Sequence, residues 1–193
     1  MATGLSVPPP LGGVASVNLL LVAGDLRVIH LSDHVTLSEA ILRVRRPAVL
    51  DLIRRTHAAL CKWGIGAPRI AVAGLNPHCK GREDDQEIGP AVADARSEGI
   101  NATGPLPPDT VFQAAAAGAF DCVVSQYHDQ GHIAIKTGGF SGSCAIVLGE
   151  PALRVSVAHG TAFDIAGRGI ADPNGMKAAI ATAASLAAGH GFP

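Results

Sequence analysis

The 193-residue chain carries almost no net charge and has no long apolar run. Its 15 lysine and arginine residues nearly balance 16 aspartate and glutamate residues, which gives a formal net charge of −1. This balance argues against a protein that binds nucleic acid or an anionic membrane. The apolar stretch at residues 17–23 is too short to cross a bilayer, and the opening MATGLSVPPPLGG lacks the basic and apolar regions of a secretory signal. We therefore expect a cytoplasmic protein with no membrane partner.

Two common binding patterns are also missing. The four cysteines, Cys61, Cys79, Cys122 and Cys144, form no CxxC pair, which excludes a zinc knuckle and a thioredoxin-type motif. Reduced thiols are the expectation. The GxGxxG fingerprint of a dinucleotide-binding turn is absent as well, so any nicotinamide cofactor must bind in another way.

Apolar runs of strand length alternate with stretches of helical period. Strands are predicted at residues 17–22, 26–31, 69–74, 120–125, 144–148 and 153–157. Helices are predicted from residue 36, from Pro47 to Trp63, over 84–98, ending near 117 and over 176–188. This alternation predicts an α/β fold with a mostly parallel or mixed sheet flanked by helices.

Histidines stand in three segments marked by turn residues. They are His30 in RVIHLSDH, His78 in AGLNPHCKG and His128 in SQYHDQGHIAIK. Three neutral imidazoles can hold a divalent cation and leave a fourth position open for a substrate oxygen, as in catalytic sites. Ligands of open α/β sheets bind where strands end, and His78 and His128 each follow a predicted strand. One such histidine alone is more often structural, so the prediction depends on all three.

For other segments and histidines, the sequence predicts only local structure or position. TGPLPPDT, at residues 103–110, is expected to be turn-rich. Gly131 and the Ile-Ala-Ile that follows His132 predict a loop and a strand rather than a helix, so His132 is not expected to be a ligand. No motif surrounds His34, His57 or His190, which are expected on the surface or in the core.

Four longer motifs point to a known family. GLNPH, TGPLPPDTVF, YHDQGHIAIK and SVAHGTAFDIAGRGIADP resemble, in this order, the 4-hydroxythreonine-4-phosphate dehydrogenase family, which includes phosphothreonate and dihydrodiol dehydrogenases. The last motif also resembles the adenosine-binding loop of isopropylmalate and isocitrate dehydrogenases. The resemblance implies a shortened version of their α/β fold that matches only the C-terminal portion of the family. Residues 1–25 are then an atypical N-terminal segment, and residues 26–193 are the metal- and cofactor-binding region.

The resemblance also implies a reaction. The family oxidises a secondary alcohol β to a carboxylate with NAD or NADP, and the keto acid that forms loses CO₂; the pathway is pyridoxine biosynthesis. The substrate would be small and anionic, such as 4-hydroxythreonine 4-phosphate or phosphothreonate. His30, His78 and His128 match ligands of a divalent metal (Zn, Mg or Co). His30 would complete, in a homodimer, an active site built largely from the other subunit.

The same resemblance implies roles for four charged residues and one loop. Lys136 and Arg154 match residues that hold the anionic substrate, and Lys136, Asp109 and Asp129 match catalytic groups beside the metal. A lysine near a cation can transfer a proton at neutral pH, and the arginine fork suits a carboxylate or phosphate. The cofactor would bind through His159, Gly160, Thr161, Ala162 and Asp164.

The chain also departs from the family pattern. It lacks most of the N-terminal half, and its GLNPH loop is shorter. Ala145 stands where the family has a substrate-binding asparagine, and Ala158 stands where it has an aspartate. The alternative hypothesis is therefore a truncated, catalytically impaired member that retains metal binding or dimerisation only. A weaker alternative is a metal-dependent lyase or hydrolase that has lost the cofactor site.

Overall fold

One sheet of seven strands runs through the molecule. The computed structural model describes residues 17–139 and 142–193, so most of the predicted N-terminal segment lies outside the described residues. The strands pair in the order β4-β3-β5-β2-β1-β6-β7. Their bounds are β1 Asn18–Ala23, β2 Leu26–His30, β3 Ile70–Ala73, β4 Ala102–Leu106, β5 Cys122–Ser125, β6 Cys144–Leu148 and β7 Arg154–Val157.

The strand directions are mixed. β2, β5, β3 and β4 are parallel to one another, whereas β1 is antiparallel to both β2 and β6, and β7 is antiparallel to β6. The predicted α/β fold with a mixed sheet is therefore confirmed. The turn-rich prediction for residues 103–110 is wrong at its start, because residues 102–106 form β4. Ala102 is buried and pairs with Ile70, and the edge position lets Pro105 be tolerated within a strand.

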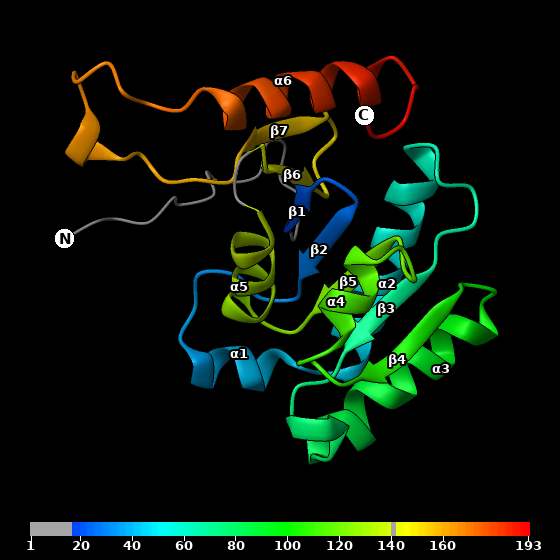
Figure 1. Ribbon diagram of the computed structural model, residues 1–193. Helices are drawn as coiled ribbons and strands as arrows, with labels where there is room; N and C mark the ends of the chain where they lie inside the picture. The colour runs from blue at the N-terminus through cyan, green and yellow to red at the C-terminus, as the bar shows by residue number, and fades with distance from the viewer. Residues whose placement is uncertain (1–16, 140–141) are drawn as a thin grey trace.

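Helices cover both faces of the sheet (Figure 1). Side chains of α2, α3 and α6 share one buried cluster, and those of α4 and α5 share another on the opposite face. No helix within residues 17–139 or 142–193 is long and apolar enough to cross a membrane. The helices are α1 Leu37–Arg43, α2 Arg46–Lys62, α3 Gly89–Ser97, α4 Val111–Ala116, α5 His128–Gly139 and α6 Asn174–Ala187, with short turns η1 Pro77–Cys79, η2 Asp84–Ile88 and η3 Phe163–Ile165.

Helix α5 corrects the prediction of a loop and strand after His128. Ile135 is 1% exposed while Ile133 is 61% exposed, so only one side of α5 is buried against the sheet. Gly131, read from the sequence as a helix breaker, is instead a point of close approach. A Cβ built there would lie 2.5 Å from Nε2 of His30 and 2.7 Å from Cγ1 of Val28. Glycine is thus what lets α5 pack tightly on β2.

The strand registers bring several loops to one edge of the sheet. The parallel strands β2, β3, β4 and β5 all end there, and the antiparallel strands β1 and β7 begin there. We call this the carboxyl edge. Pairing places one row of residues along it, in the order Leu106, Ala73, Ser125, His30, Leu19, Val147 and Arg154. Ligands of open α/β sheets bind at such an edge.

Replacing Gly131 with alanine tests the close packing of α5. A new methyl group would collide with His30 and Val28, so we expect Gly131→Ala to lower the free energy of unfolding by about 1–3 kcal/mol despite alanine's better helix propensity. Urea denaturation followed by circular dichroism measures this. Gly66→Ala is the matched control, because a Cβ at Gly66 meets nothing within 4 Å. Equal stability of the two variants would contradict the packing.

Candidate functional site

A buried carboxylate holds the loop that follows β3. Asp84 is 1% exposed and accepts hydrogen bonds from the backbone N–H of Leu75 (2.7 Å), the backbone N–H of Asn76 (3.2 Å) and the Asn76 side chain (2.8 Å). The loop then enters η1, where His78 and Cys79 both have φ of 55°. Non-glycine residues in this left-handed region cost about 1–3 kcal/mol and concentrate at functional sites. The anchored loop presents His78 to solvent.

Two glutamines tie the start of α5 to the end of β3. The Gln126 side chain donates to the carbonyl of Ala73 (2.7 Å), and the Gln130 side chain donates to the carbonyl of Gly74 (2.8 Å). Gln130 also accepts from the backbone N–H of Gln126 at 2.7 Å. These bonds fix the turn between β5 and α5 beside the β3 loop. The side chains at the start of α5 therefore lie next to the loop that carries His78.

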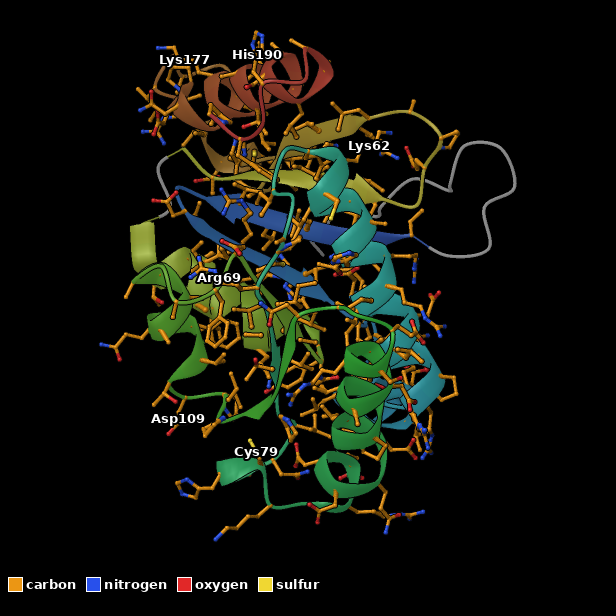
Figure 2. All side chains as sticks on the ribbon, turned by 90° about the vertical axis from the view of Figure 1, so that its right-hand side faces the viewer. Lys62, Arg69, Cys79, Asp109, Lys177 and His190 are labelled. Carbon is orange, nitrogen blue, oxygen red and sulfur yellow. The ribbon has the colours of Figure 1, made fainter. Side chains whose placement is uncertain are left out.

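Two adjacent cavities open at the carboxyl edge. The larger, about 550 Å³, is lined by His78, Asp109 and Asp129, among others. The smaller, about 280 Å³, is lined by His34, His128 and Asp129, and both cavities share Tyr127 and Asp129. Figure 2 labels Asp109 and the neighbouring Cys79 at this end of the molecule. The fold thus gathers four predicted site residues, His78, Asp109, His128 and Asp129, around neighbouring openings.

Four histidine rings cluster where β2 meets α5. The rings of His128 and His132 stack with their centroids 3.6 Å apart, and His132 lies 4.7 Å from His30. The His34 ring is 5.3 Å from that of His128. His30 and His128 are brought to 6.2 Å between centroids. The sequence prediction had connected only His30 and His128 of these four.

Burial makes the inner imidazoles neutral. It lowers the pKa of His30 to about 3, with help from nearby His132, and lowers the pKa of His132 to about 4, with help from His128. Burial also raises the pKa of the Asp33 carboxyl to about 6. Asp129 behaves differently, because its 2.7 Å hydrogen bond from Nδ1 of His128 lowers its pKa. Neutral imidazoles and a charged Asp129 are the forms that bind a cation.

His30 and His34 differ in access. His30 is fully buried, and its Nδ1 donates to the Leu19 carbonyl at 3.1 Å. Its Nε2 is enclosed and has no partner among the residues that the structure describes. His34 is exposed and lines the smaller cavity together with His128. The sequence reasoning missed His34 because no motif had been assigned to it, although it lies four residues from His30 in the same segment.

The donor chemistry at the edge suits a divalent metal, since it offers neutral imidazoles and carboxylates. Within residues 17–139 and 142–193, however, no three histidine, cysteine, aspartate or glutamate side chains converge closely enough to hold one. The unpaired Nε2 of His30 is a further donor, although an enclosed one. A metal site formed by His30, His78 and His128 with a second subunit stays a prediction.

The two predicted substrate cations, Lys136 and Arg154, lie on different elements, α5 and β7. Lys136 is exposed on α5, and its charge contributes to the lowered pKa values of Asp129 and His132. Arg154 begins β7 and donates from Nη1 to Oε1 of Glu150 at 2.8 Å. Glu150, which the sequence reasoning had not singled out, thereby orients the Arg154 guanidinium.

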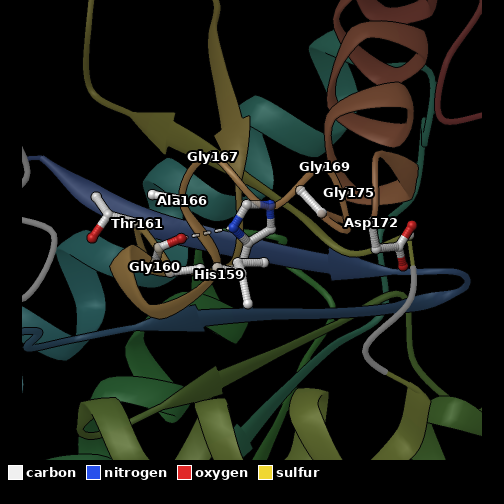
Figure 3. Close-up of a pocket in the computed structure, with 12 residues that line it drawn as sticks. His159, Gly160, Thr161, Ala166, Gly167, Gly169, Asp172 and Gly175 are labelled. Atoms are coloured by element: carbon white, nitrogen blue, oxygen red, sulfur yellow. Dashed lines mark hydrogen bonds between the residues drawn. The ribbon is translucent and has the colours of Figure 1, made fainter.

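A third cavity, about 660 Å³, is formed mostly by the segment that connects β7 to α6 (Figure 3). Four predicted cofactor residues, His159 through Ala162, line it, and Nδ1 of His159 donates to the Gly160 carbonyl at 2.8 Å. Asp164, the fifth predicted cofactor residue, is exposed within η3 and is not among the lining residues. Asp172, which the prediction had left out, does line the cavity. The remaining walls come from Gly142, Ile165, Ala166, Gly167, Gly169, Ala171 and Gly175.

Residues 11–183 match the family model described as pyridoxal phosphate biosynthetic protein PdxA. The chain belongs to the PdxA family. It is 49% identical over 174 residues to a putative 4-hydroxythreonine-4-phosphate dehydrogenase of Novosphingobium aromaticivorans, covering 90% of this chain and 53% of the relative. It is 45% identical over 183 residues to the D-threonate 4-phosphate dehydrogenase of Cupriavidus necator, covering 92% and 55%. The predicted family is confirmed.

Solved structures agree with this assignment. The chain aligns with 4-hydroxythreonine-4-phosphate dehydrogenase from Klebsiella pneumoniae at a TM-score of 0.80 and 40% identity, covering 90% of this chain and 55% of the other. It aligns with a terephthalate 1,2-cis-dihydrodiol dehydrogenase from Burkholderia xenovorans at 0.73 and 33%, covering 92% and 57%. This PdxA-family chain therefore spans about half the length of these relatives.

The neutral histidines predict a pH dependence of stability. His30 and His132 have folded pKa values of about 3 and about 4, below the ordinary 6.5, so the unfolded chain takes up protons that the folded chain does not. The free energy of unfolding should fall as pH drops from about 6.5 toward 4, by up to about 1.4 kcal/mol per pH unit for each histidine. Asp33, with its raised pKa, has the opposite sign and offsets part of this loss.

Urea denaturation at several pH values, with a chelator present, measures this slope. We expect His132→Gln to flatten it, because one of the two neutral histidines is removed. His190→Gln, which changes an exposed histidine on the far side of the chain, is the control and should leave the slope unchanged. A wild-type slope that is flat, or that rises toward low pH, would contradict the neutral state of the cluster.

Proposed function

We propose that this chain takes part in the NAD(P)- and divalent-metal-dependent oxidation of a small anionic secondary alcohol to a keto acid that then loses CO₂. The substrate class is that of 4-hydroxythreonine 4-phosphate or D-threonate 4-phosphate, the compounds in the names of its relatives. One observation supports this proposal most. The carboxyl edge gathers imidazoles, carboxylates and an oriented arginine in a fold that also carries a glycine-lined cavity beside α6.

For the metal, we propose His34, His78 and His128 as the imidazole donors. All three line cavities at the carboxyl edge, whereas the predicted ligand His30 is enclosed beneath α5. When bound, such a metal would polarise the substrate alcohol and lower its pKa. Because the three do not converge within one chain, we propose that a homodimer completes the site. In this proposal His30 is not a ligand, and its buried ring stacks against the ring of His132.

The substrate's acidic groups would bind at Lys136 and Arg154. Among the described residues, Glu150 engages one N–H of the Arg154 guanidinium, and the other donors could contact a carboxylate or phosphate. Asp129 and Asp109, which both line the larger cavity, would accept protons near the reacting alcohol. Lys136, exposed on the same helix as Asp129, would return a proton after CO₂ is lost.

The dinucleotide would occupy the cavity formed by the segment that connects β7 to α6. Its volume of about 660 Å³ lies in the usual range for ligand sites, about 300–1,000 Å³. Five of its lining residues are Gly142, Gly160, Gly167, Gly169 and Gly175. Glycine lets a ligand come close to the backbone, whose N–H groups can then contact phosphate oxygens.

The second candidate function is a catalytically impaired family member that retains metal binding or dimerisation only. One structural observation favours it. Ala145 is 4% exposed and packs within the buried cluster beneath α5, so its methyl group offers no polar contact where the family has an asparagine. Metal and cofactor binding without turnover is the behaviour that this alternative predicts.

Metal analysis combined with assays of NADH formation tests the proposal. We expect the purified chain to bind about one zinc or cobalt ion per predicted site and to reduce NAD⁺ when given 4-hydroxythreonine 4-phosphate or D-threonate 4-phosphate. His34→Ala, His78→Ala and His128→Ala should each weaken metal binding by at least about tenfold, since each removes a donor. His190→Ala is the control and should bind metal normally.

The outcomes separate the candidates. Metal bound without NADH formation would favour the impaired member over the enzyme. Metal lost in His30→Ala but retained in His34→Ala would restore the sequence-based ligand set. If the wild-type protein binds no divalent metal, both proposed ligand sets, the one with His30 and the one with His34, are overturned.

A further inference from the structure

Among the residues that the structure describes, one charged side chain lines the cavity formed by the segment that connects β7 to α6. The lining consists of glycine, alanine and isoleucine together with His159, Thr161 and Asp172, and it includes no lysine or arginine. Arg168 lies between the lining residues Gly167 and Gly169 without lining the cavity itself, and Lys177 on α6 does not line it either. A ligand in this cavity therefore meets one carboxylate and no cation from the lining residues of the described chain.

Asp172 is held in place with one oxygen left over. Its Oδ1 accepts a hydrogen bond from the backbone N–H of Asn174 at 2.9 Å, at the start of α6. Its Oδ2 accepts no hydrogen bond from the part of the chain that the structure describes. Figure 3 shows the carboxylate at one end of the cavity, with His159 between it and Thr161. The free oxygen can accept a hydrogen bond from a ligand hydroxyl.

We propose that Asp172 makes this cavity selective for a nicotinamide dinucleotide without a 2′-phosphate, that is, for NAD over NADP. The inference rests on the proposed function, which places the dinucleotide here. A carboxylate can accept hydrogen bonds from the ribose hydroxyls of the adenosine, as acidic residues do in other dinucleotide sites. The 2′-phosphate of NADP would replace such a hydroxyl with a dianion. It would then face Asp172 at close range with no lining cation to compensate.

This assignment differs from the sequence-based one. Asp164 was the acidic residue predicted to contact the cofactor, but it lies in η3 with an exposed side chain and does not line the cavity. Asp164 and Asp172 belong to the same segment between β7 and α6 and carry the same charge. Asp164 is therefore a matched control for effects of net charge that do not depend on position.

Equilibrium binding to the purified full chain tests the proposal without any need for turnover. NADH and NADPH are titrated with their own fluorescence as the signal, and NAD⁺ and NADP⁺ are measured by competition. We expect the wild type to prefer NADH over NADPH by at least about tenfold, a factor equivalent to roughly 1.4 kcal/mol. Asp172→Asn removes the charge but keeps an oxygen that can cap Asn174, and it should reduce this preference by at least about fivefold. Asp164→Asn should leave the preference unchanged.

Ionic strength provides a second readout. Because Asp172 is exposed to solvent, salt should screen its repulsion of the 2′-phosphate, and the wild-type preference for NADH over NADPH should narrow as salt is raised. In Asp172→Asn the preference should depend on salt far less. If Asp172 only caps the start of α6, Asp172→Asn should weaken the binding of both dinucleotides alike and leave the ratio of their affinities unchanged.

The possible failures are distinct. Equal binding of NADH and NADPH by the wild type overturns the selectivity while leaving the cofactor site intact. A preference that Asp172→Asn does not alter, or that Asp164→Asn alters equally, assigns the selectivity elsewhere and also overturns the inference. Binding of neither dinucleotide contradicts the cofactor site of the proposed function, and the selectivity with it.

Discussion

The pairing register of the sheet is the constraint on which the candidate site depends. It sets one row of residues from Leu106 to Arg154, so the loops that follow β2, β3, β4 and β5 all leave the sheet at the same edge. A slip of one residue would turn His30 to the opposite face, away from α5, because side chains alternate along a strand. Residues up to 135 positions apart in the chain, Leu19 and Arg154, thus share one edge without any contact between their own loops being required.

The close packing of α5 on β2 adds the second requirement. Gly131 brings the helix so near to His30 that the rings of His30, His132 and His128 lie in succession from the sheet outward. Burial keeps the inner two neutral, and the outermost ring reaches the cavity beside His34. The cluster therefore combines a dry interior, which fixes ring positions, with an accessible surface, where a ligand can bind. A fully buried histidine such as His30 is better suited to the first role than to the second.

Much of this arrangement could be predicted from sequence, and the exceptions have physical causes. The motifs located His78, Asp109, His128 and Asp129, and the structure brings these four to adjoining cavities. Helix α5 was missed because local patterns treat a glycine as a breaker, whereas here it serves a tertiary contact. Strand β4 was missed because Gly104 and Pro105 favour a turn locally, and only pairing with β3 overrides that preference.

Side-chain access was the other property that the sequence did not reveal. His30 and His34 lie in one segment, yet one is enclosed and the other lines a cavity, a difference decided by where β2 ends. Asp164 and Asp172 are both exposed, yet of the two only Asp172 lines a cavity, because the start of α6 holds its carboxylate there. Exposure of this kind depends on packing between elements distant in the chain.

Anomalous X-ray scattering from crystals grown with zinc and NAD⁺ would show where the metal and the dinucleotide bind. We predict a zinc peak at the carboxyl edge, about 2.0–2.1 Å from imidazole nitrogens of His34, His78 and His128 contributed by one or two chains. We also predict electron density for the adenosine in the cavity beside Asp172. A zinc ion bound away from this edge, or a dinucleotide bound outside that cavity, would contradict these predictions.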